Sequence, residues 1–370
     1  MVKKMQKNDD IITTGQAMAL VINAAIGIGL LSLPREVTSE AGPDGWLVLL
    51  LGGFFTLMGA LAAAAIIRQL DGRTFVDYVC FVFGKPVGLI LSILYGIYFI
   101  IVLSSVFRTF AEVMKNLALE RTPREFLILS LMLVSVYLIY HGLEPTARFM
   151  EFILPLWFIP SVVILSLGLY DSDFGEFLPF LQTPLEKLLL GSLSTAMSMA
   201  GYEVLLVSAQ SVSRHEKISY VMAVSIIVVL AFYALILVTV VTSLGIAETQ
   251  RAIWPTLAMI TRITVPGKIL ERLDVVVVIV WVVVVYTTVC AYYFAAALTF
   301  TNIFKAREFR SFIALLFPWI YFLAMIPQNV LEAESLAKLG GNMVIATSFA
   351  IPLLLLIGGL LKKRVKKDEA

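Results

Sequence analysis

The sequence predicts an all-α membrane protein with ten transmembrane helices, two of which are interrupted near their midpoints. Of its 370 residues, 60% are hydrophobic and only 15% are charged, a balance well outside that of soluble domains. Apolar runs recur along the chain, most of them near or above the roughly 20 residues that a helix needs to cross the hydrocarbon. Two of these runs contain helix-breaking residues at matching depths, which a plain membrane anchor does not need.

The apolar runs mark ten spans joined by short connections, so we expect a single transmembrane domain over residues 1–370. Five spans fall in repeat one, about 12–170, and five in repeat two, about 187–361. If the halves are repeats, an odd number of spans in each gives them opposite orientations in the membrane. The spans lie at about 12–34, 45–67, 86–111, 125–141, 151–170, 187–210, 217–246, 274–304, 311–329 and 339–361.

The distribution of Lys and Arg places both termini in the cytoplasm. Basic residues are in excess in the segments on that side, and the tail at 362–370 adds to the excess. The polar stretch Met1 to Asp10 runs directly into an uncharged segment that is longer than the apolar part of a signal peptide. We therefore expect the first span to remain in the mature multi-pass protein.

Two connections have features of their own. Asp71 to Phe83 has an amphipathic pattern and predicts a short interfacial helix. Ala247 to Asp274 lies outside the membrane in this topology and is interrupted at Trp254-Pro255 and Pro266-Gly267. It is long enough to form a lid.

The first span contains Gly27 and Gly29 near its midpoint and Pro34 five residues further on. Glycine costs about 1 kcal/mol relative to alanine inside a helix, and proline removes a backbone donor. One interpretation is close packing, since small residues let membrane helices approach each other. The other is a break in the helix, which survives in lipid only where the opened backbone faces protein or a wet cavity.

The sixth span favours the second interpretation, because Ser198 to Glu203 forms a comparable fault at a matching depth. Gly27 and Ala200 are separated by close to the length of one half of the chain. Two interrupted helices at equivalent positions of inverted halves indicate a binding site near the membrane midplane.

Glu203 is the only acidic residue deep within any of the ten runs. A carboxylate at this depth is costly and defaults to a functional interpretation. Just after Gly201, it would lie at the positive end of a half-helix, which favours its ionised form. It could then receive a substrate ammonium or carry a coupling proton; the alternative is a structural hydrogen bond to a neighbouring helix.

The backbone groups freed in the first span add two further contacts. Amides around Ile28, Gly29 and Leu30 would point at an anion, and carbonyls at Asn23, Ala24 and Ile26 would face a cation. Together with Glu203 they suit a zwitterion, so a small amino acid is the expected ligand, with other small polar solutes as the alternative. The candidate binding residues are Ala24, Ala25, Ile26, Gly27, Ile28, Gly29, Gly201, Tyr202, Glu203 and Tyr98.

Hydroxyl groups in two other spans have two interpretations each. Thr287 and Thr288 either bond back to their own helix or form, with Asn23, a cation site or a water path. Tyr95 and Tyr98 either pack or line a cavity.

Arg108 is the one basic residue within the third span. It either snorkels to the outer interface or pairs with Glu112 one turn along the helix. Neither interpretation requires a special role for it.

Several classes of protein are excluded by what the sequence lacks. There is no pair of intramembrane aspartates and no phosphate-cradling Gly-Lys-Ser/Thr run, so we do not expect an enzyme. His141 and His215 have no further His or Cys at ligand spacing, so neither a metal nor a cofactor is expected. The net charge of +2 is small and scattered, which argues against nucleic acid as a partner. Cys80 and Cys290 provide no disulfide framework.

The segment Ile26 to Pro34, followed by Arg35, resembles the first-span signature of spore-germination permeases, the B subunits of germinant receptors in the amino acid–polyamine–organocation superfamily. Gly201-Tyr202-Glu203 resembles that family's Gly-Tyr-Glu element. The length, the ten spans and the basic tail agree over essentially the whole chain.

The resemblance implies a LeuT-like 5+5 inverted-repeat fold with discontinuous helices 1 and 6. It also implies a nutrient germinant as ligand, and a complex with a larger A subunit and a C-subunit lipoprotein in the spore inner membrane. By position, Ala25 to Gly29 and Gly201 to Glu203 would form the germinant pocket. One departure is that the fifth span, Glu151 to Tyr170, contains no lysine of the kind that some proton-coupled members of the superfamily place there.

Three functional hypotheses follow. The first is a receptor subunit that binds an amino acid and signals to partner proteins, and the second is an ion-coupled amino-acid symporter that works alone. Both need the same pocket, so the sequence does not separate them. A weaker third hypothesis is an ion or water conduit through the bundle.

Overall fold

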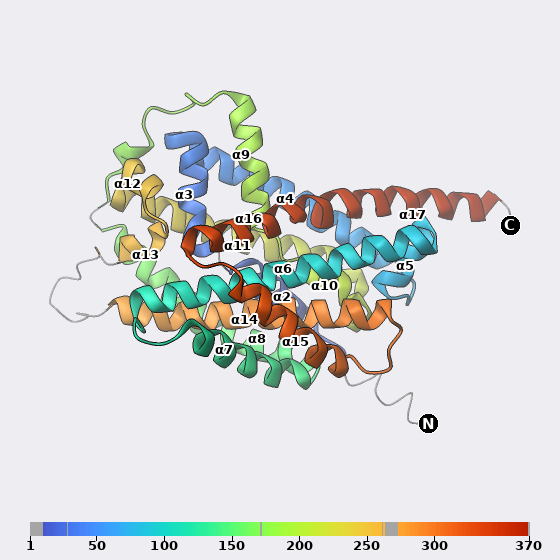
Figure 1. Cartoon of the computed structure of the whole chain (residues 1–370). Helices are drawn as coiled ribbons and strands as arrows, with labels where there is room; N and C mark the ends of the chain where they lie inside the picture. Colours follow the sequence, from blue (N-terminus) through green and yellow to red (C-terminus); the bar gives the residue numbers. More distant parts are fainter. Residues whose placement is uncertain (1–9, 28, 171, 261, 263–272, 369–370) are drawn as a thin grey trace.

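A computed structural model describes residues 10–27, 29–170, 172–260, 262 and 273–368 of the chain, without the side chains of 273, 274 and 363–368. Its helices pack into one bundle (Figure 1). The helices are α2 (Thr14–Ala25), α3 (Gly29–Ala41), α4 (Gly45–Gln69), α5 (Phe75–Phe83), α6 (Lys85–Leu117), α7 (Arg124–Tyr140), α8 (Leu143–Gly168), α9 (Leu185–Ser198), α10 (Glu203–Val207), α11 (Ile218–Leu244), α12 (Ile246–Arg251), α13 (Pro255–Ile260), α14 (Leu273–Ile303), α15 (Arg310–Met325), α16 (Val330–Val344) and α17 (Ile351–Asp368).

Within the described ranges, six helical stretches are long and apolar enough to cross a membrane. They confirm the all-α membrane class, whereas the count of ten crossings remains a prediction. The predicted interfacial helix at 71–83 is present as α5. The six stretches are Gly29–Gln69, Lys85–Leu117, Leu143–Gly168, His215–Leu244, Val275–Ile303 and Val330–Lys362.

The first span is divided into α2 and α3, as predicted. Thr13 begins α2 with a capping box, in which its hydroxyl accepts from the Gln16 amide and the Gln16 side chain accepts from the Thr13 amide at 2.8 Å. Helix α2 ends at Ala25 and α3 begins at Gly29. Ile28 lies outside the described residues.

Pro34 has a specific consequence inside α3. Because proline has no N–H, the carbonyl of Leu30, four residues earlier, loses its helical donor. The Thr256 hydroxyl of α13 takes that place and donates to the Leu30 carbonyl at 2.7 Å. The proline thus creates the acceptor that fixes the predicted outer loop to α3.

The sixth span is divided into α9 and α10, again at the predicted position. Helix α9 ends at Ser198 and α10 begins at Glu203. Between them Gly201 has a φ of 150°, a conformation that residues with a Cβ rarely adopt.

The tenth predicted span begins earlier than expected, at Val330 instead of about 339. The charged residues Glu332, Glu334 and Lys338 suggested a connection, but they lie on helix α16. A six-residue π-helix, Ile345–Ala350, joins α16 to α17. This segment is a third irregularity that the sequence interpretation did not identify.

The chain just before α2 is tied to the chain just after α10. The Ile12 amide donates to the Ser211 carbonyl at 2.7 Å, and the Ser213 amide donates to the Ile12 carbonyl at 3.1 Å. The chain after α10 also contacts the turn before α5, where the Gln210 side chain donates to the Gly72 carbonyl at 2.8 Å, and α5 packs against α17. Helices α12 and α13 lie on the opposite side of the bundle from the C-terminal end of α17 (Figure 1).

Candidate functional site

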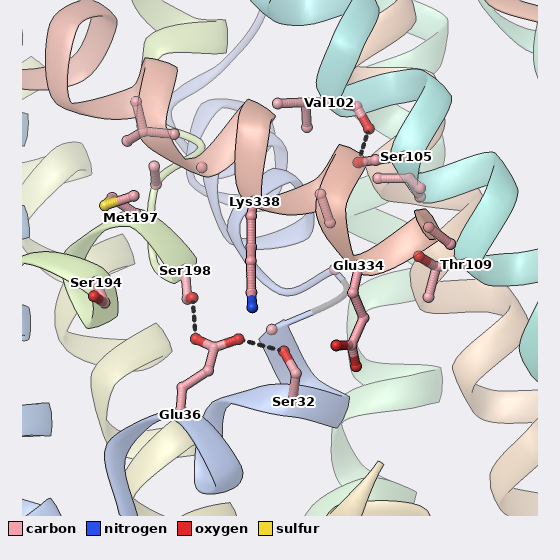
Figure 2. Close-up of a pocket in the computed structure, with 18 of the residues that line it drawn as sticks. Ser32, Glu36, Val102, Ser105, Thr109, Ser194, Met197, Ser198, Glu334 and Lys338 are labelled. Atoms are coloured by element: carbon pink, nitrogen blue, oxygen red, sulfur yellow. Dashed lines mark hydrogen bonds between the residues drawn. The ribbon is translucent and has the colours of Figure 1, made fainter. Parts of the chain in front are cut away.

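A cavity of about 510 Å³ opens between the breaks of the first and sixth spans and helices α6, α14 and α16. A volume of this size suits a small organic molecule. The deep end is lined by Ala24, Ala25, Gly27, Gly29, Tyr98, Ala200, Thr288 and Tyr292. The outer part is lined by residues of α3, α6, α9 and α16, several of which carry charge (Figure 2).

The two breaks touch each other at glycine. A Cβ on Gly201 would lie 2.6 Å from the Ala25 nitrogen and 2.8 Å from its Cα, so no larger residue fits between the two chain segments. A Cβ on Gly29 would lie 2.7 Å from the Tyr233 hydroxyl and 3.0 Å from the Ser198 carbonyl. The Tyr233 hydroxyl itself donates to the Ala25 carbonyl at 3.0 Å. The glycines therefore serve both interpretations, a helix break and a close approach of backbones.

The Glu203 side chain is completely buried, at 0% exposure. One carboxylate oxygen accepts from the Tyr98 hydroxyl of α6 at 2.5 Å and from the Tyr292 hydroxyl of α14 at 3.2 Å. The other accepts from the Gly201 amide at 2.9 Å. Three donors from three segments surround the carboxylate, as a buried acidic group requires.

Glu203 lies behind the cavity wall and does not line the cavity. Tyr98 and Tyr292 stand between the two, because each lines the cavity and also donates to the carboxylate. The structure thus places Glu203 as a tie between helices, the alternative that the sequence left open. It positions the cavity wall through Tyr98 and Tyr292, and a direct role of Glu203 in substrate binding stays a prediction.

The candidate cation or water residues are divided in the same way. Thr287 bonds back to the Val284 carbonyl at 2.8 Å. Thr288 lines the cavity, and its hydroxyl donates to the Asn23 carbonyl at 2.7 Å. The Asn23 side chain accepts from the Trp157 indole at 3.0 Å and donates to the Ala19 carbonyl at 2.8 Å, so it holds α2 against α8.

The cavity brings together half of the predicted binding residues. Ala24, Ala25, Gly27, Gly29 and Tyr98 line it. Ile26, Gly201, Tyr202 and Glu203 are buried outside its lining, and Ile28 lies outside the described residues.

Tyr202 and Tyr95 are both directed at the π-helix. The Tyr202 hydroxyl donates to the Ser348 carbonyl at 2.5 Å, and the Tyr95 hydroxyl donates to the Thr347 carbonyl. A π-turn leaves carbonyls without their usual helical partners, and the two tyrosines satisfy them. Tyr95 therefore packs and bonds within the core instead of lining the cavity.

Glu36 is a cavity residue that the sequence interpretation missed. Its carboxylate accepts from the Ser32 hydroxyl in the first turn of α3 and from the Ser198 hydroxyl at the end of α9, both at 2.8 Å. Figure 2 shows these contacts beside the two helix breaks. The available signal was the Ser32-to-Glu36 spacing of four, which places both side chains on one helix face.

Helix α16 contributes two further charged residues that the misplaced helix start concealed. Glu334 forms a two-point ion pair with Arg35 of α3, with distances of 2.8 and 3.3 Å. Lys338, one turn later, extends into the cavity toward Glu36 (Figure 2). Lys338 makes no ion pair or hydrogen bond with the residues that the structure describes.

Arg108 pairs with Glu112 at 2.7 Å, and Glu112 also pairs with Arg124 of α7 at 2.9 Å. Arg108 is 1% exposed and Glu112 is 3% exposed. The pairing interpretation is therefore correct and the snorkelling interpretation is wrong. Among the described residues, no group of three His, Cys, Asp or Glu side chains could hold a metal ion.

Comparison with solved structures supports the same architecture. The chain is similar to MhsT in complex with L-phenylalanine, with a TM-score of 0.71, 15% identity and coverage of 95% of this chain and 99% of that one. It is also similar to Mhp1, a nucleobase-cation-symport-1 transporter, with a TM-score of 0.70, 14% identity and coverage of 93% and 78%. The fold is that of a LeuT-fold membrane protein, the class in which two interrupted helices surround a central cavity.

Within that class, the chain belongs to the spore germination protein family, whose family model matches residues 11–333. It is 28% identical to spore germination protein YndE of Bacillus subtilis over 359 residues, covering 96% of this chain and 98% of the relative. It is 25% identical to spore germination protein GerLB of Bacillus cereus over 370 residues, covering 99% of each. It is also 28% identical to spore germination protein A2 of Bacillus subtilis, over 71% of this chain and 72% of that protein.

Proposed function

We propose that this protein is the amino-acid-binding subunit of a spore germination receptor and acts as a binding protein, not an enzyme. The observation that carries the proposal is the 510 Å³ cavity at the meeting point of two broken helices. A pocket of this kind combines freed backbone groups with a few charged side chains, which suits a small zwitterion. The phenylalanine complex of the structurally similar MhsT supports an amino acid as the ligand class.

The binding event passes to partner proteins, a larger A subunit and a C-subunit lipoprotein, in the spore inner membrane. This part of the proposal rests on the family relationship. Both termini lie in the cytoplasm, and the cavity opens on the opposite side. Sequence charge supports this orientation, as does the position of the C-terminal helix and the Ile12 pairing on one side of the bundle.

Thermal unfolding of the purified protein with each of the twenty standard amino acids tests the binding proposal. A ligand at about 100 times its Kd stabilises the folded state by about 2.7 kcal/mol. Absence of stabilisation by all twenty would contradict an amino-acid site.

A cavity-filling variant supplies the matched control. Gly341 lines the cavity, and a Cβ there would meet only the Met197 Cε, at 3.5 Å. We expect Gly341→Leu to fold and to lose ligand stabilisation. Gly29→Leu is less informative, because its Cβ would already collide with the Tyr233 hydroxyl.

A second candidate function, a stand-alone ion-coupled amino-acid symporter, is favoured by the likeness to Mhp1, a nucleobase-cation-symport-1 transporter, and to MhsT, whose structure holds L-phenylalanine. Liposomes that contain only this chain separate the two functions. Accumulation of labelled amino acid under a sodium or proton gradient would establish the symporter. Saturable binding without accumulation would support the receptor subunit.

A further inference from the structure

Glu36 occupies a position that no other acidic residue of the cavity shares. Its carboxylate receives one hydroxyl from each of the two half-helices that flank the breaks, Ser32 on α3 and Ser198 on α9. Each oxygen accepts one of these hydrogen bonds and retains a further lone pair. The carboxylate is therefore held in place, half-buried, and still able to accept from a ligand.

Lys338 is the counterpart of Glu36 across the cavity. It extends from α16 with its ammonium directed toward Glu36, yet the two charges do not come within ion-pair distance (Figure 2). Arg35, the other basic residue of the lining, is neutralised by its two-point contact with Glu334. Of the described residues that line the cavity, Lys338 is thus the cation left without a protein partner.

The deep carboxylate is not available for the same task. Glu203 already accepts from two tyrosine hydroxyls and one amide, and it lies behind the cavity wall. A ligand in the cavity can reach Glu36 and Lys338 but not Glu203.

We propose that Glu36 and Lys338 read the two ends of a zwitterion: Glu36 accepts from its ammonium group and Lys338 donates to its carboxylate. The inference rests on the proposed function and names the side chains of the same cavity that recognise each charge of the ligand. It requires both charges on one small molecule, so that simple amines and simple carboxylic acids each lose one contact. The ligand would connect α3 to α16, because its ammonium would pair with Glu36 and its carboxylate with Lys338, two side chains that are too far apart to pair with each other.

Binding of charge-edited ligands tests the assignment. The probes are L-alanine, L-valine and L-phenylalanine, each compared with its amide and its des-amino acid, at about pH 6.5, where the α-amino group is protonated. In the unaltered protein the amino acid should bind more tightly than either analogue. Lys338→Gln should weaken binding of the amino acid by about tenfold to a hundredfold and leave binding of the amide unchanged. Only the amino acid has a carboxylate that loses a charged contact with Lys338.

Glu36→Gln gives the reciprocal result. It should weaken binding of both the amino acid and its amide, which carry the ammonium group, and leave binding of the des-amino acid unchanged. Glutamine retains an acceptor for the serine hydroxyls, so the variant should fold. If it does not fold, Lys338→Glu gives an independent test, because this variant should bind the amide more tightly than the amino acid. Lys187→Gln and Glu186→Gln, which alter exposed charges on α9, serve as matched controls.

Two outcomes overturn the inference in different ways. In the first, the unaltered protein binds an amino acid, but Lys338→Gln weakens binding of the amino acid and of its amide by the same factor, or changes the binding of neither. The charge assignment is then wrong and the proposed function stands. If none of the twenty standard amino acids binds the unaltered protein, the amino-acid site itself is contradicted, and the assignment of the two charges falls with it.

Discussion

Gly201 is the residue at which the two broken helices come into contact. Its φ of 150° and the 2.6 Å approach to the Ala25 nitrogen leave no room for a side chain. We expect Gly201→Ala to reduce the free energy of unfolding by about 3 kcal/mol, from backbone strain and overpacking together. Thermal unfolding in detergent measures the loss. Gly341→Ala is the matched control, since its Cβ meets no atom closer than 3.5 Å and should leave stability unchanged or slightly raised.

Glu203 predicts a graded response to substitution. Glutamine can still accept from the Gly201 amide while the hydroxyls of Tyr98 and Tyr292 rotate to accept from its amide group. Alanine leaves three buried donors without a partner. We expect Glu203→Gln to cost about 1 kcal/mol of stability with weakened ligand binding, and Glu203→Ala to cost at least about 3 kcal/mol. Equal stability of both variants would contradict a role as a tie between helices.

Asp44 introduces a pH dependence in the turn between α3 and α4, which is the connection between the first two predicted spans at about 12–34 and 45–67. Burial raises the pKa of its carboxyl group, but hydrogen bonds from the Thr183, Leu181 and Gln182 amides and the Thr183 hydroxyl outweigh burial and lower the pKa below its ordinary value of 3.8. The three amide contacts measure 2.8, 2.6 and 2.8 Å. They hold the connection before α9 against the turn between α3 and α4.

A lowered carboxyl pKa stabilises the folded state at pH values above 3.8, and that stability is lost as the pH falls through the lower, folded-state pKa. We expect Asp44→Asn to reduce stability by about 2 kcal/mol at neutral pH. The difference from the unaltered protein should narrow in acid, as thermal unfolding over a pH series would record. Asp71→Asn, at an exposed turn with a φ of 49° that asparagine tolerates, is the matched control and should leave stability at neutral pH unchanged.

At the scale of helices, the π-helix Ile345–Ala350 separates α16, which carries Glu334 and Lys338 of the cavity lining, from α17. Tyr202 links it to the break in the sixth span. Tyr202→Phe should leave the Ser348 carbonyl unpaired and cost about 1–3 kcal/mol. Amide hydrogen exchange should speed up over residues 345–350.

Tyr293→Phe is the matched control for that exchange experiment. Its hydroxyl donates to the Ile313 carbonyl of α15 at 2.7 Å, so its loss removes one buried hydrogen bond at a different place. Exchange should then rise in α15 and stay unchanged in the π-helix. Faster exchange over residues 345–350 in both variants would indicate a general loss of stability instead.

The two broken helices were predictable because glycine and proline act locally. Gly27, Gly29 and Gly201 indicate in the sequence itself where a helix can break, and both breaks occur at these residues. The contact partners of Glu203 were not predictable, since Tyr98 and Tyr292 approach it from distant helices. Periodicity along one helix does not determine which face of another helix meets it.

The charged wall of the cavity was missed for a related reason. Glu334 and Lys338 suggested a connection because charges are costly in lipid. They are tolerated on α16 because they face a cavity and, for Glu334, an arginine. A helix that lines such a cavity therefore has a polar face, and a hydropathy pattern then predicts a loop in its place. Glu36 was overlooked for the same reason, because it lies near the end of a predicted span.

For the whole molecule, the cavity is lined in part by Ile253 and Trp254, between α12 and α13, and these two helices lie on the side of the bundle opposite the C-terminal end (Figure 1), which makes the orientation testable. The test uses a variant with Cys80 and Cys290 replaced by Ala, to which a single cysteine is added at Glu40, a residue of the cavity lining, or at Asp77 on α5. A membrane-impermeant maleimide should label Glu40→Cys on intact cells. Asp77→Cys should react only after permeabilisation, and the reverse pattern would invert the topology.

The pairing of Ile12 with Ser211 and Ser213 gives α2 and α10 a second point of attachment, beyond the contact of Gly201 with Ala25. Two short helices fastened at both ends form one rigid body. We therefore expect any displacement that starts at an occupied cavity to reach the terminal face as a joint movement of the pair. A neighbouring subunit that touched either helix on that face would sense both halves of the inverted repeat at once.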